Sequence, residues 1–379
     1  MDKNIILLSD KDKKDKERPW VSKKVKSDLL ADSYERLKMF KKSEKVRDCG
    51  SFLEFRRFHD QSLKLNYANF CKDRLCPMCG WRRSLKIFGQ TSQIMDKVTA
   101  DKNYKFIFLT LTIRNVKGDD LSDTIDHMFK TWHLFIKRKK IKDSVLGWFR
   151  ALEVTHDVDQ LITPLSYSIR KKTLKKLGLN VGDPNPTFNT YHPHFHCIMM
   201  VPSRYYKEKE LYIKQSDFST MWKEVLKIDY EPIVHVEKFK GDTDYEVKKG
   251  VAESTKYTVK DNDYLLEDDE LMTDSTVNIL SNALFRRRLV ALGGEFKKIA
   301  KELKLDDCLD GDLVHTDQLD RYDPYDKDHV IDALTGEIIL KDDLRDQGIK
   351  LREDLEYMIE KYYWHVGYNQ FVKVEPIKK

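Results

Sequence analysis

The sequence predicts an α+β fold, with a split βαβ antiparallel sheet (ferredoxin- or RRM-like) that carries helices on one face. From residue 105 onward, short segments rich in β-branched and aromatic residues alternate with segments of helical periodicity. They follow one another in the order strand, helix, two strands, helix, strand and helix, which is the split βαβ order. Because the helices cover one face of such a sheet, the other face is free for a functional site.

The individual elements of this domain, about residues 100–265, follow from local pattern. β-branched and aromatic runs predict the strands, and amphipathic periodicity predicts the helices. The expected strands are Lys105–Ile113, Trp148–Thr155, His194–Val201 and Ile233–Phe239, and the expected helices are Leu121–Lys140, Ser216–Leu226 and Tyr245–Lys260. A polar insertion, about residues 157–190, separates the second strand from the third.

Three further regions flank this domain. Residues 1–45 are rich in Lys, Asp, Ser and Glu, which predicts a charged flexible arm. Residues 46–95 hold four of the six cysteines and predict a small zinc-binding module. After an acidic linker, residues 275–379 are expected to be mainly helical, with one helical pattern over about Val277–Leu303.

Composition excludes a membrane protein. The chain has 379 residues with 69 basic and 63 acidic side chains, a net charge of +6, and no apolar run of about eighteen residues. Its first ten residues are too short and too closely flanked by acidic residues for a signal peptide. Six cysteines without a secretion signal indicate a reducing compartment, so we expect a cytoplasmic protein.

The cysteines predict a structural zinc site. Cys76 and Cys79 form a C-x-x-C pair, and Cys71 and Cys49 complete four thiolates, the soft tetrahedral set that Zn²⁺ prefers. His59 is an alternative fourth ligand in place of Cys49. The competing interpretation is a set of free buried cysteines.

The run Tyr191–Val201 predicts a second metal site. Side chains alternate along a strand, so His194 and His196 share one face. Two imidazoles side by side in an apolar strand are costly without a partner, although a single buried histidine is usually a core residue. Glu153 on the neighbouring strand is the preferred third ligand, and His192 is the alternative. Such a set leaves open positions and suits Mn²⁺ or Mg²⁺ in phosphoryl transfer.

A tyrosine supplies a candidate nucleophile. Glu253 and Tyr257 are four residues apart, so they lie one turn apart on one face of the expected helix. A phenol is a poor nucleophile until a nearby cation favours the phenolate, and Lys260 or Lys256 is placed to provide that charge. A tyrosine on a helix is otherwise usually a packing residue.

These segments together resemble the motifs of plasmid rolling-circle replication initiators, in the HUH (His-hydrophobic-His) endonuclease superfamily. The resemblance runs from Cys49 to about residue 315 and includes features typical of the branch found on Gram-positive plasmids. It rests on Phe108–Thr112, His192–His196, Glu253-x-x-x-Tyr257-x-x-Lys260, Cys76–Arg83 and Gly293–Lys297.

The resemblance implies a site-specific single-strand DNA endonuclease and strand transferase. Tyr257 would attack a DNA phosphate, leaving a 5′-phosphotyrosyl enzyme and a free 3′-OH primer, and Glu253 would activate water in the terminating cleavage. A glutamate where two-tyrosine initiators carry a second tyrosine implies the one-tyrosine type, with Tyr264 as a minor rival nucleophile. The implied partners are supercoiled origin DNA with an extruded single strand, and a host helicase and polymerase. The oligomeric state does not follow from the sequence.

Basic residues provide candidate DNA contacts, although each cluster alone is also compatible with a solvated face. They are Lys256, Arg82, Arg83, Arg286 and Arg287. Two other functions remain open: a conjugative relaxase or single-tyrosine transposase with the same chemistry, and a zinc-stabilised DNA-binding repressor without catalysis. Relaxases usually carry the tyrosine before the histidine cluster, whereas here it follows.

Overall fold

The structure is a computed structural model. It describes residues 5–12, 15–99, 104–238, 251, 259–266, 268–314, 329–331, 338–346 and 356–374. Within these ranges, no helix is both long and apolar enough to cross a membrane.

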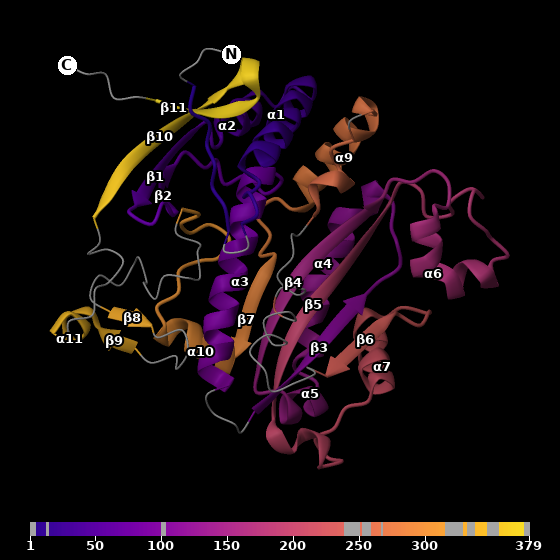
Figure 1. The fold of residues 1–379 in the computed structure, drawn as a ribbon. Coiled ribbons are helices and arrows are strands. Elements are labelled where there is room, and N and C mark those ends of the chain that lie inside the picture. The colour runs from indigo at the N-terminus through magenta and orange to yellow at the C-terminus, as the bar shows by residue number, and fades with distance from the viewer. Residues whose placement is uncertain are drawn as a thin grey trace.

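A five-stranded sheet in the order β6-β3-β5-β4-β7 carries the histidine run, and every neighbouring pair is antiparallel (Figure 1). The predicted α+β class is confirmed. The strands are β3 Tyr104–Thr112, β4 Gly147–Asp157, β5 Thr190–Pro202, β6 Val234–Lys238 and β7 Val290–Gly294.

Helices cover one face of this sheet. They are α4 Gly118–Phe135, α5 Lys139–Ser144 and α7 Gln215–Leu226. Phe195 of β5 stacks on Phe129 of α4 at 5.7 Å between ring centroids, and it also meets Trp132 and Trp222. Because strand side chains alternate, burying Phe195 under these helices turns His194 and His196 to the opposite face.

A second, four-stranded sheet in the order β11-β10-β1-β2 joins the two ends of the chain (Figure 1). Its strands are β1 Phe52–Phe58, β2 Leu63–Ala68, β10 Tyr357–His365 and β11 Gln370–Lys373. The N-terminal residue Leu8 donates a backbone hydrogen bond to Phe371 of β11. Two helices, α1 Trp20–Arg36 and α2 Phe40–Asp48, pack beside it, and Trp20 meets Phe55 edge-on at 5.7 Å.

The remaining elements connect and flank the sheets. The long helix α3 Pro77–Thr99 runs alongside β7 and α10 in Figure 1. The others are α6 Pro164–Lys176, α9 Glu270–Ala283, α10 Glu295–Glu302, β8 His329–Ile331, β9 Ile338–Leu340 and α11 Lys341–Asp346, with short 3₁₀ turns η1 Ser203–Tyr206, η2 Asp261–Asp263 and η4 Val366–Tyr368.

Three expectations differ from the structure. The charged flexible arm over residues 1–45 is wrong for the described part, because α1 buries Trp20, Leu30 and Tyr34 in the core. The mainly helical C-terminal region is wrong as well, since β7 completes one sheet and β10 and β11 belong to the other.

The helix expected over Val277–Leu303 is interrupted by β7. The backbone adopts positive φ at Arg286, before this strand, and at Gly294, its last residue. The insertion 157–190 contains a helix, α6, that begins with a capping box formed by Thr163 and Ser166. Most of the helix expected over Tyr245–Lys260 lies outside the described residues.

Candidate active site and cysteine cluster

The sheet face opposite α4 and α7 brings together Glu153, His194 and His196. Glu153 of β4 stands directly opposite His194 of β5 in the antiparallel ladder. His196 Nε2 lies 2.9 Å from Glu153 Oε2 and 3.1 Å from His194 Nε2. The remaining pair, His194 Nε2 and Glu153 Oε2, is 3.6 Å apart. Strand register thus gathers three potential ligand atoms at one point of the sheet.

These separations fit one divalent cation. An ion about 2.1 Å from each ligand holds neighbouring ligand atoms roughly 3.0–3.4 Å apart, for angles between octahedral and tetrahedral. The three observed separations, 2.9, 3.1 and 3.6 Å, bracket that range. Two imidazoles and one carboxylate leave coordination positions open for water or a phosphate oxygen.

Hydrogen bonds hold the imidazoles in a suitable tautomer. His194 Nδ1 lies 3.0 Å from the His192 carbonyl oxygen, so it donates its hydrogen there and leaves Nε2 as an acceptor. His196 Nδ1 lies 3.5 Å from the Thr110 hydroxyl on β3. Burial alone would raise the pKa of Glu153, but its interactions with His194 and His196 outweigh burial and hold that pKa well below its usual range.

His192, the alternative third ligand, does not belong to this group of ligand atoms. It shares the face with His194 and stacks on it with 5.1 Å between ring centroids. Burial, reinforced by the neighbouring charge of His194, lowers the pKa of His192 to about 4. Its main-chain carbonyl, rather than its ring, contributes to the arrangement by orienting His194.

The candidate nucleophile Tyr257 lies outside the described residues, as do Glu253 and Lys256. On either side of them, Val251 and Val259 are both buried. Val259 lines the same cavity as Ala151, which stands opposite His196 in the ladder. The chain two residues after Tyr257 therefore lies beside the strand that carries Glu153.

The segment that follows Val259 interacts electrostatically with the metal-ligand group. Lys260 is exposed, and η2 begins at the next residue. Burial raises the pKa of Asp263 to about 6, while the charge of Lys260 opposes the rise and that of Glu153 adds to it. The Asp263 carbonyl oxygen is 3.0 Å from His156 Nδ1 of β4, which fixes this segment against the sheet.

Tyr264, the rival nucleophile, is a core residue. It is 2% exposed, and its hydroxyl donates a hydrogen bond to the carbonyl oxygen of Leu75. Burial raises the pKa of its phenol well above the ordinary value. A phenol that is both protonated and enclosed cannot reach a DNA phosphate, so the expectation of Tyr264 as an alternative nucleophile is wrong.

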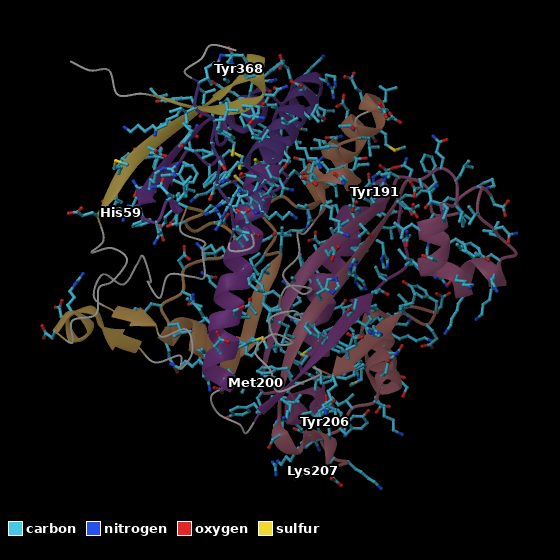
Figure 2. All side chains as sticks on the ribbon, in the orientation of Figure 1. His59, Tyr191, Met200, Tyr206, Lys207 and Tyr368 are labelled. Atoms are coloured by element: carbon cyan, nitrogen blue, oxygen red, sulfur yellow. The ribbon has the colours of Figure 1, made fainter. Side chains whose placement is uncertain are left out.

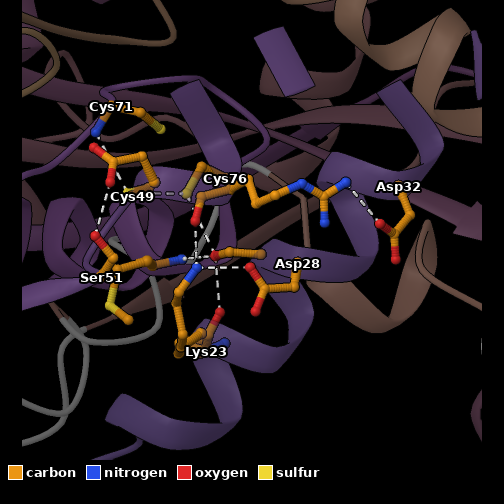
Figure 3. A network of polar contacts seen from close by, with 12 residues as sticks. Lys23, Asp28, Asp32, Cys49, Ser51, Cys71 and Cys76 are labelled. Atoms are coloured by element: carbon orange, nitrogen blue, oxygen red, sulfur yellow. Dashed lines mark hydrogen bonds and ion pairs between the residues drawn. The ribbon is translucent and has the colours of Figure 1, made fainter. Parts of the chain in front are cut away.

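The four cysteines of the predicted zinc site converge in one cluster. Figure 3 labels three of them, Cys49, Cys71 and Cys76. Cys49 Sγ lies 3.5 Å from both Cys76 Sγ and Cys79 Sγ, and Cys71 Sγ lies 3.7 Å from Cys79 Sγ. Thiolates about 2.3 Å from a tetrahedral zinc ion are roughly 3.8 Å apart. The cluster therefore fits Zn²⁺ closely.

Backbone amides support these sulfurs as they do in zinc knuckles. The amide of Lys72 donates to Cys79 Sγ at 3.2 Å, and that of Asp73 donates to Cys71 Sγ at 3.4 Å. Lys72 adopts φ +59°, the turn that brings Cys71 next to Cys79. The alternative ligand His59 is excluded, because it is exposed in the turn between β1 and β2 (Figure 2), whereas Cys49 belongs to the cluster.

Three arginines expected to contact DNA are instead engaged in the fold. Arg82 is 1% exposed, lies near the rings of Trp20 and Trp81, and donates to the carbonyls of Leu313 and Val314. Arg83 is also buried and donates to the Leu309 carbonyl. The expectation is therefore wrong for Arg82 and Arg83.

Arg287 forms a two-pronged ion pair with Asp126 of α4 at 2.7 Å for each contact. Arg286 remains exposed, with its guanidinium 5.0 Å from the ring of Phe285. Arg288, the third arginine of this cluster, has a side chain that is 73% exposed. The Phe-Arg-Arg-Arg run was the available signal, but sequence alone did not distinguish the three arginines.

Comparison with known proteins supplies a family. A family model described as "Replication protein" matches residues 62–334. A "Protein rep" of Bacillus amyloliquefaciens is 37% identical over 339 residues, which cover 83% of this chain and 90% of that protein. A "Protein rep" of Streptococcus pneumoniae is 36% identical over 313 residues, with 82% and 87% covered. No solved structure matches the chain.

Proposed function

Because the chain belongs to the replication protein family, the Gram-positive plasmid replication initiators that its sequence resembles, we propose that it nicks plasmid origin DNA through Tyr257 to start rolling-circle replication. The observation that carries the proposal is the convergence of Glu153, His194 and His196 at one point of the sheet. A structural histidine pair would not need a carboxylate within hydrogen-bond distance.

In the proposed reaction, the phenol oxygen of Tyr257 attacks a backbone phosphorus and loses its proton. The bond from phosphorus to the 3′ oxygen breaks, that oxygen becomes the free 3′-OH primer, and the 5′ phosphate remains on the tyrosine. A divalent cation, Mn²⁺ or Mg²⁺, held by Glu153, His194 and His196 would neutralise charge on the phosphate oxygens. Lys260, exposed three residues after Tyr257, would favour the phenolate.

Termination requires a second cleavage with water as the nucleophile. Glu253, one helical turn before Tyr257 in the expected helix, is the proposed base for that water. Because the nucleophile in this second cleavage is a water activated by a carboxylate, the enzyme is released and no second phosphotyrosine forms. The proposed partners are the supercoiled origin with its extruded strand and, after nicking, a host helicase and polymerase.

We propose a structural role for the cysteine cluster. Four thiol groups buried or half-buried at zinc-like spacing leave no open position for a substrate, as in closed zinc sites. A zinc-stabilised repressor that binds the origin without cutting it is the second candidate function. The cysteine cluster suits it equally, but the Glu153–His194–His196 group has no role in it.

The test uses a supercoiled plasmid that carries this gene with its flanks, incubated with the protein and Mn²⁺ or Mg²⁺. The proposal expects nicked circles and a DNA-linked peptide containing Tyr257, both lost in Tyr257→Phe. Glu253→Gln should nick but fail to release the DNA. If the plasmid and single-stranded flank DNA both stay intact while the protein binds them tightly, the repressor is the correct function.

A further inference from the structure

A cleft of about 510 Å³ lies beside the cysteine cluster. One wall comes from the knuckle that carries Cys71 and Cys76, and the other from the loop Phe285–Arg288 that leads from α9 into β7. Its lining includes the cations Lys42, Lys72, Arg74, Arg286, Arg287 and Arg288.

Cations outnumber carboxylates in this cleft, six to three, counting the lining residues. Four of the cations are bonded within the fold: Arg74 pairs with Asp310 at 2.9 Å, and Arg287 pairs with Asp126 of α4. The other two are Lys42, which donates to Ser281, and Lys72, which donates to the Asp310 carbonyl. Arg286 and Arg288 differ because both are exposed. The nearest carboxylate recorded for Arg288, that of Asp307, is 3.9 Å away, the outer limit of an ion pair.

An exposed aromatic ring accompanies these two arginines. Phe285 is 57% exposed, whereas Leu284 before it is buried, so the ring projects from the point where the chain leaves α9. A planar ring in solvent is available to stack on a base. Guanidinium groups beside an exposed aromatic ring are the combination that binds single-stranded nucleic acid, through phosphates and base stacking.

The cleft adjoins a second cavity that reaches the catalytic face. Arg74 and Leu75 line both cavities. The second cavity is also lined by Ala151, opposite His196 on the sheet, and by Val259, two residues after Tyr257. This small cavity, about 30 Å³, therefore lies between the cleft and the sheet face that carries the Glu153–His194–His196 group.

We propose that this cleft binds the single strand leading away from the nick site, with Arg286 and Arg288 on its phosphates and Phe285 stacked on a base. The inference rests on the proposed function for the identity of the strand. It adds a binding site outside the catalytic face. A phosphate alone would not use the exposed ring, and the width of duplex DNA is poorly matched to a cleft of this volume.

The test measures binding of single-stranded origin oligonucleotides by fluorescence anisotropy, in a Tyr257→Phe background that prevents cleavage. Oligonucleotides are lengthened in turn on either side of the nick, and a duplex of the same sequence forms a separate arm. The variants are Arg286→Gln with Arg288→Gln, and Phe285→Ala. Matched controls are Lys207→Gln with Lys209→Gln, both exposed and outside the cleft lining, and Phe40→Ala, 63% exposed and also outside it. Figure 2 shows Lys207 at the bottom of the molecule.

The slope of log K against log salt is negative, and each phosphate contact contributes roughly −0.7 for single strands. Removing two contacts should therefore make the slope less negative by about 1.4. Phe285→Ala should weaken binding at least about fivefold with the slope unchanged. Both losses should appear only with oligonucleotides extended on one side of the nick. Control variants that behave like the cleft variants, losses confined to the duplex, or no loss at all would overturn the proposal.

The experiments distinguish a failure of the cleft assignment from a failure of the proposed nuclease function. If the parent protein nicks DNA through Tyr257 and the cleft variants bind normally, only the cleft assignment fails. If the parent protein never nicks but the cleft variants lose single-strand binding, the nuclease proposal fails while the binding site stands.

Discussion

The hydroxyl of Tyr264 donates a hydrogen bond to the main-chain carbonyl of Leu75. Leu75 immediately precedes Cys76 of the cysteine cluster, and Tyr264 follows Tyr257 by seven residues. A second connection runs from Lys23 of α1 to Asp261 of η2, at 2.6 Å. The segment after the proposed nucleophile is therefore fixed to the cysteine module, so the position of that segment depends on the module's integrity.

Tyr264→Phe should destabilise the protein without changing the site of covalent attachment. The variant leaves the buried Leu75 carbonyl without this donor, at a cost of about 1–2 kcal/mol in the free energy of unfolding. Urea unfolding measures the cost, and peptide mass spectrometry locates the DNA adduct. An adduct lost from a folded Tyr264→Phe protein would mean that Tyr264, against its burial, is the nucleophile.

Loss of one cluster cysteine should remove zinc. Cys76→Ser is expected to lower bound zinc from about one ion per chain to none, because a closed tetrahedral site needs all four thiolates. Since zinc binding contributes to the free energy of folding, the Cys76→Ser variant should unfold at a clearly lower temperature than the parent protein. Cys308→Ser is the matched control, as Cys308 does not belong to the cluster. Equal zinc content in the two variants, measured by elemental analysis, would contradict a zinc site at Cys76.

Metal binding by single variants should show whether Glu153 or His192 is the third ligand beside His194 and His196. Glu153→Gln and His196→Ala each remove a ligand, so Mn²⁺ binding should weaken at least about 100-fold, beyond the range seen for residues that merely orient ligands. His192→Ala keeps the carbonyl that orients His194 and should change Mn²⁺ binding less than about tenfold. Titration calorimetry distinguishes these outcomes. A loss in His192→Ala as large as in Glu153→Gln would make His192 a ligand.

Much of this site was predictable because it depends on short-range rules. The period-two alternation of a strand places His194 and His196 on one face, and antiparallel pairing of neighbouring strands places Glu153 opposite them. The cysteine spacing likewise predicts the cluster. In both cases the chemistry of the side chains restricts the alternatives, since polar rings and thiols clustered in a core need a common partner.

The wrong predictions concern residues whose burial or strand pairing depends on segments far away in the sequence. Lys24 belongs to a run typical of a solvated arm, yet it is 1% exposed, because its ammonium donates to Asp28 and to the carbonyl of Arg47. Strand β10 pairs with β1 from the other end of the chain, and no local pattern reports that pairing. From the sequence, Arg82 was expected on the surface. In the structure it lies near two tryptophan rings and donates to two main-chain carbonyls, contacts that its local sequence does not predict.

The ion pair between Lys23 and Asp261 predicts a pH dependence of stability. Burial would raise the pKa of Asp261, but its bond from Lys23 and the charges of Lys23 and Lys26 outweigh burial and lower that pKa. A lowered carboxylate pKa stabilises the fold above the unfolded-state value, about 3.9, and this stabilisation is lost as the pH falls through the folded-state value.

Asp261→Asn should accordingly be less stable than the parent protein at pH 6, and the difference should shrink below about pH 4. Urea unfolding at a series of pH values measures it. A difference that grows as the pH falls would show that Asp261 is not held ionised by the two lysines.

Gly294 explains one sequence feature of the resemblance in physical terms. It ends β7 beside Gly147 of β4 and adopts φ +57° and ψ −137°, a conformation that L side chains avoid. A Cβ there would lie 2.1 Å from the carbonyl oxygen of Leu146, which already accepts a hydrogen bond from Glu295. Because the clash is with backbone, no side-chain rotation relieves it.

Gly294→Ala should therefore destabilise the protein by more than about 3 kcal/mol, adding a steric clash to the strain of positive φ. Gly178→Ala isolates the strain alone: Gly178 has φ +71° after α6, with no atom within 4 Å of an added Cβ. It should cost about 1–2 kcal/mol. Urea unfolding compares the two. Equal losses would mean that the β4–β7 edge shifts freely to accept a methyl group, and the paired strand that carries Glu153 would then be less rigidly placed than its hydrogen bonds indicate.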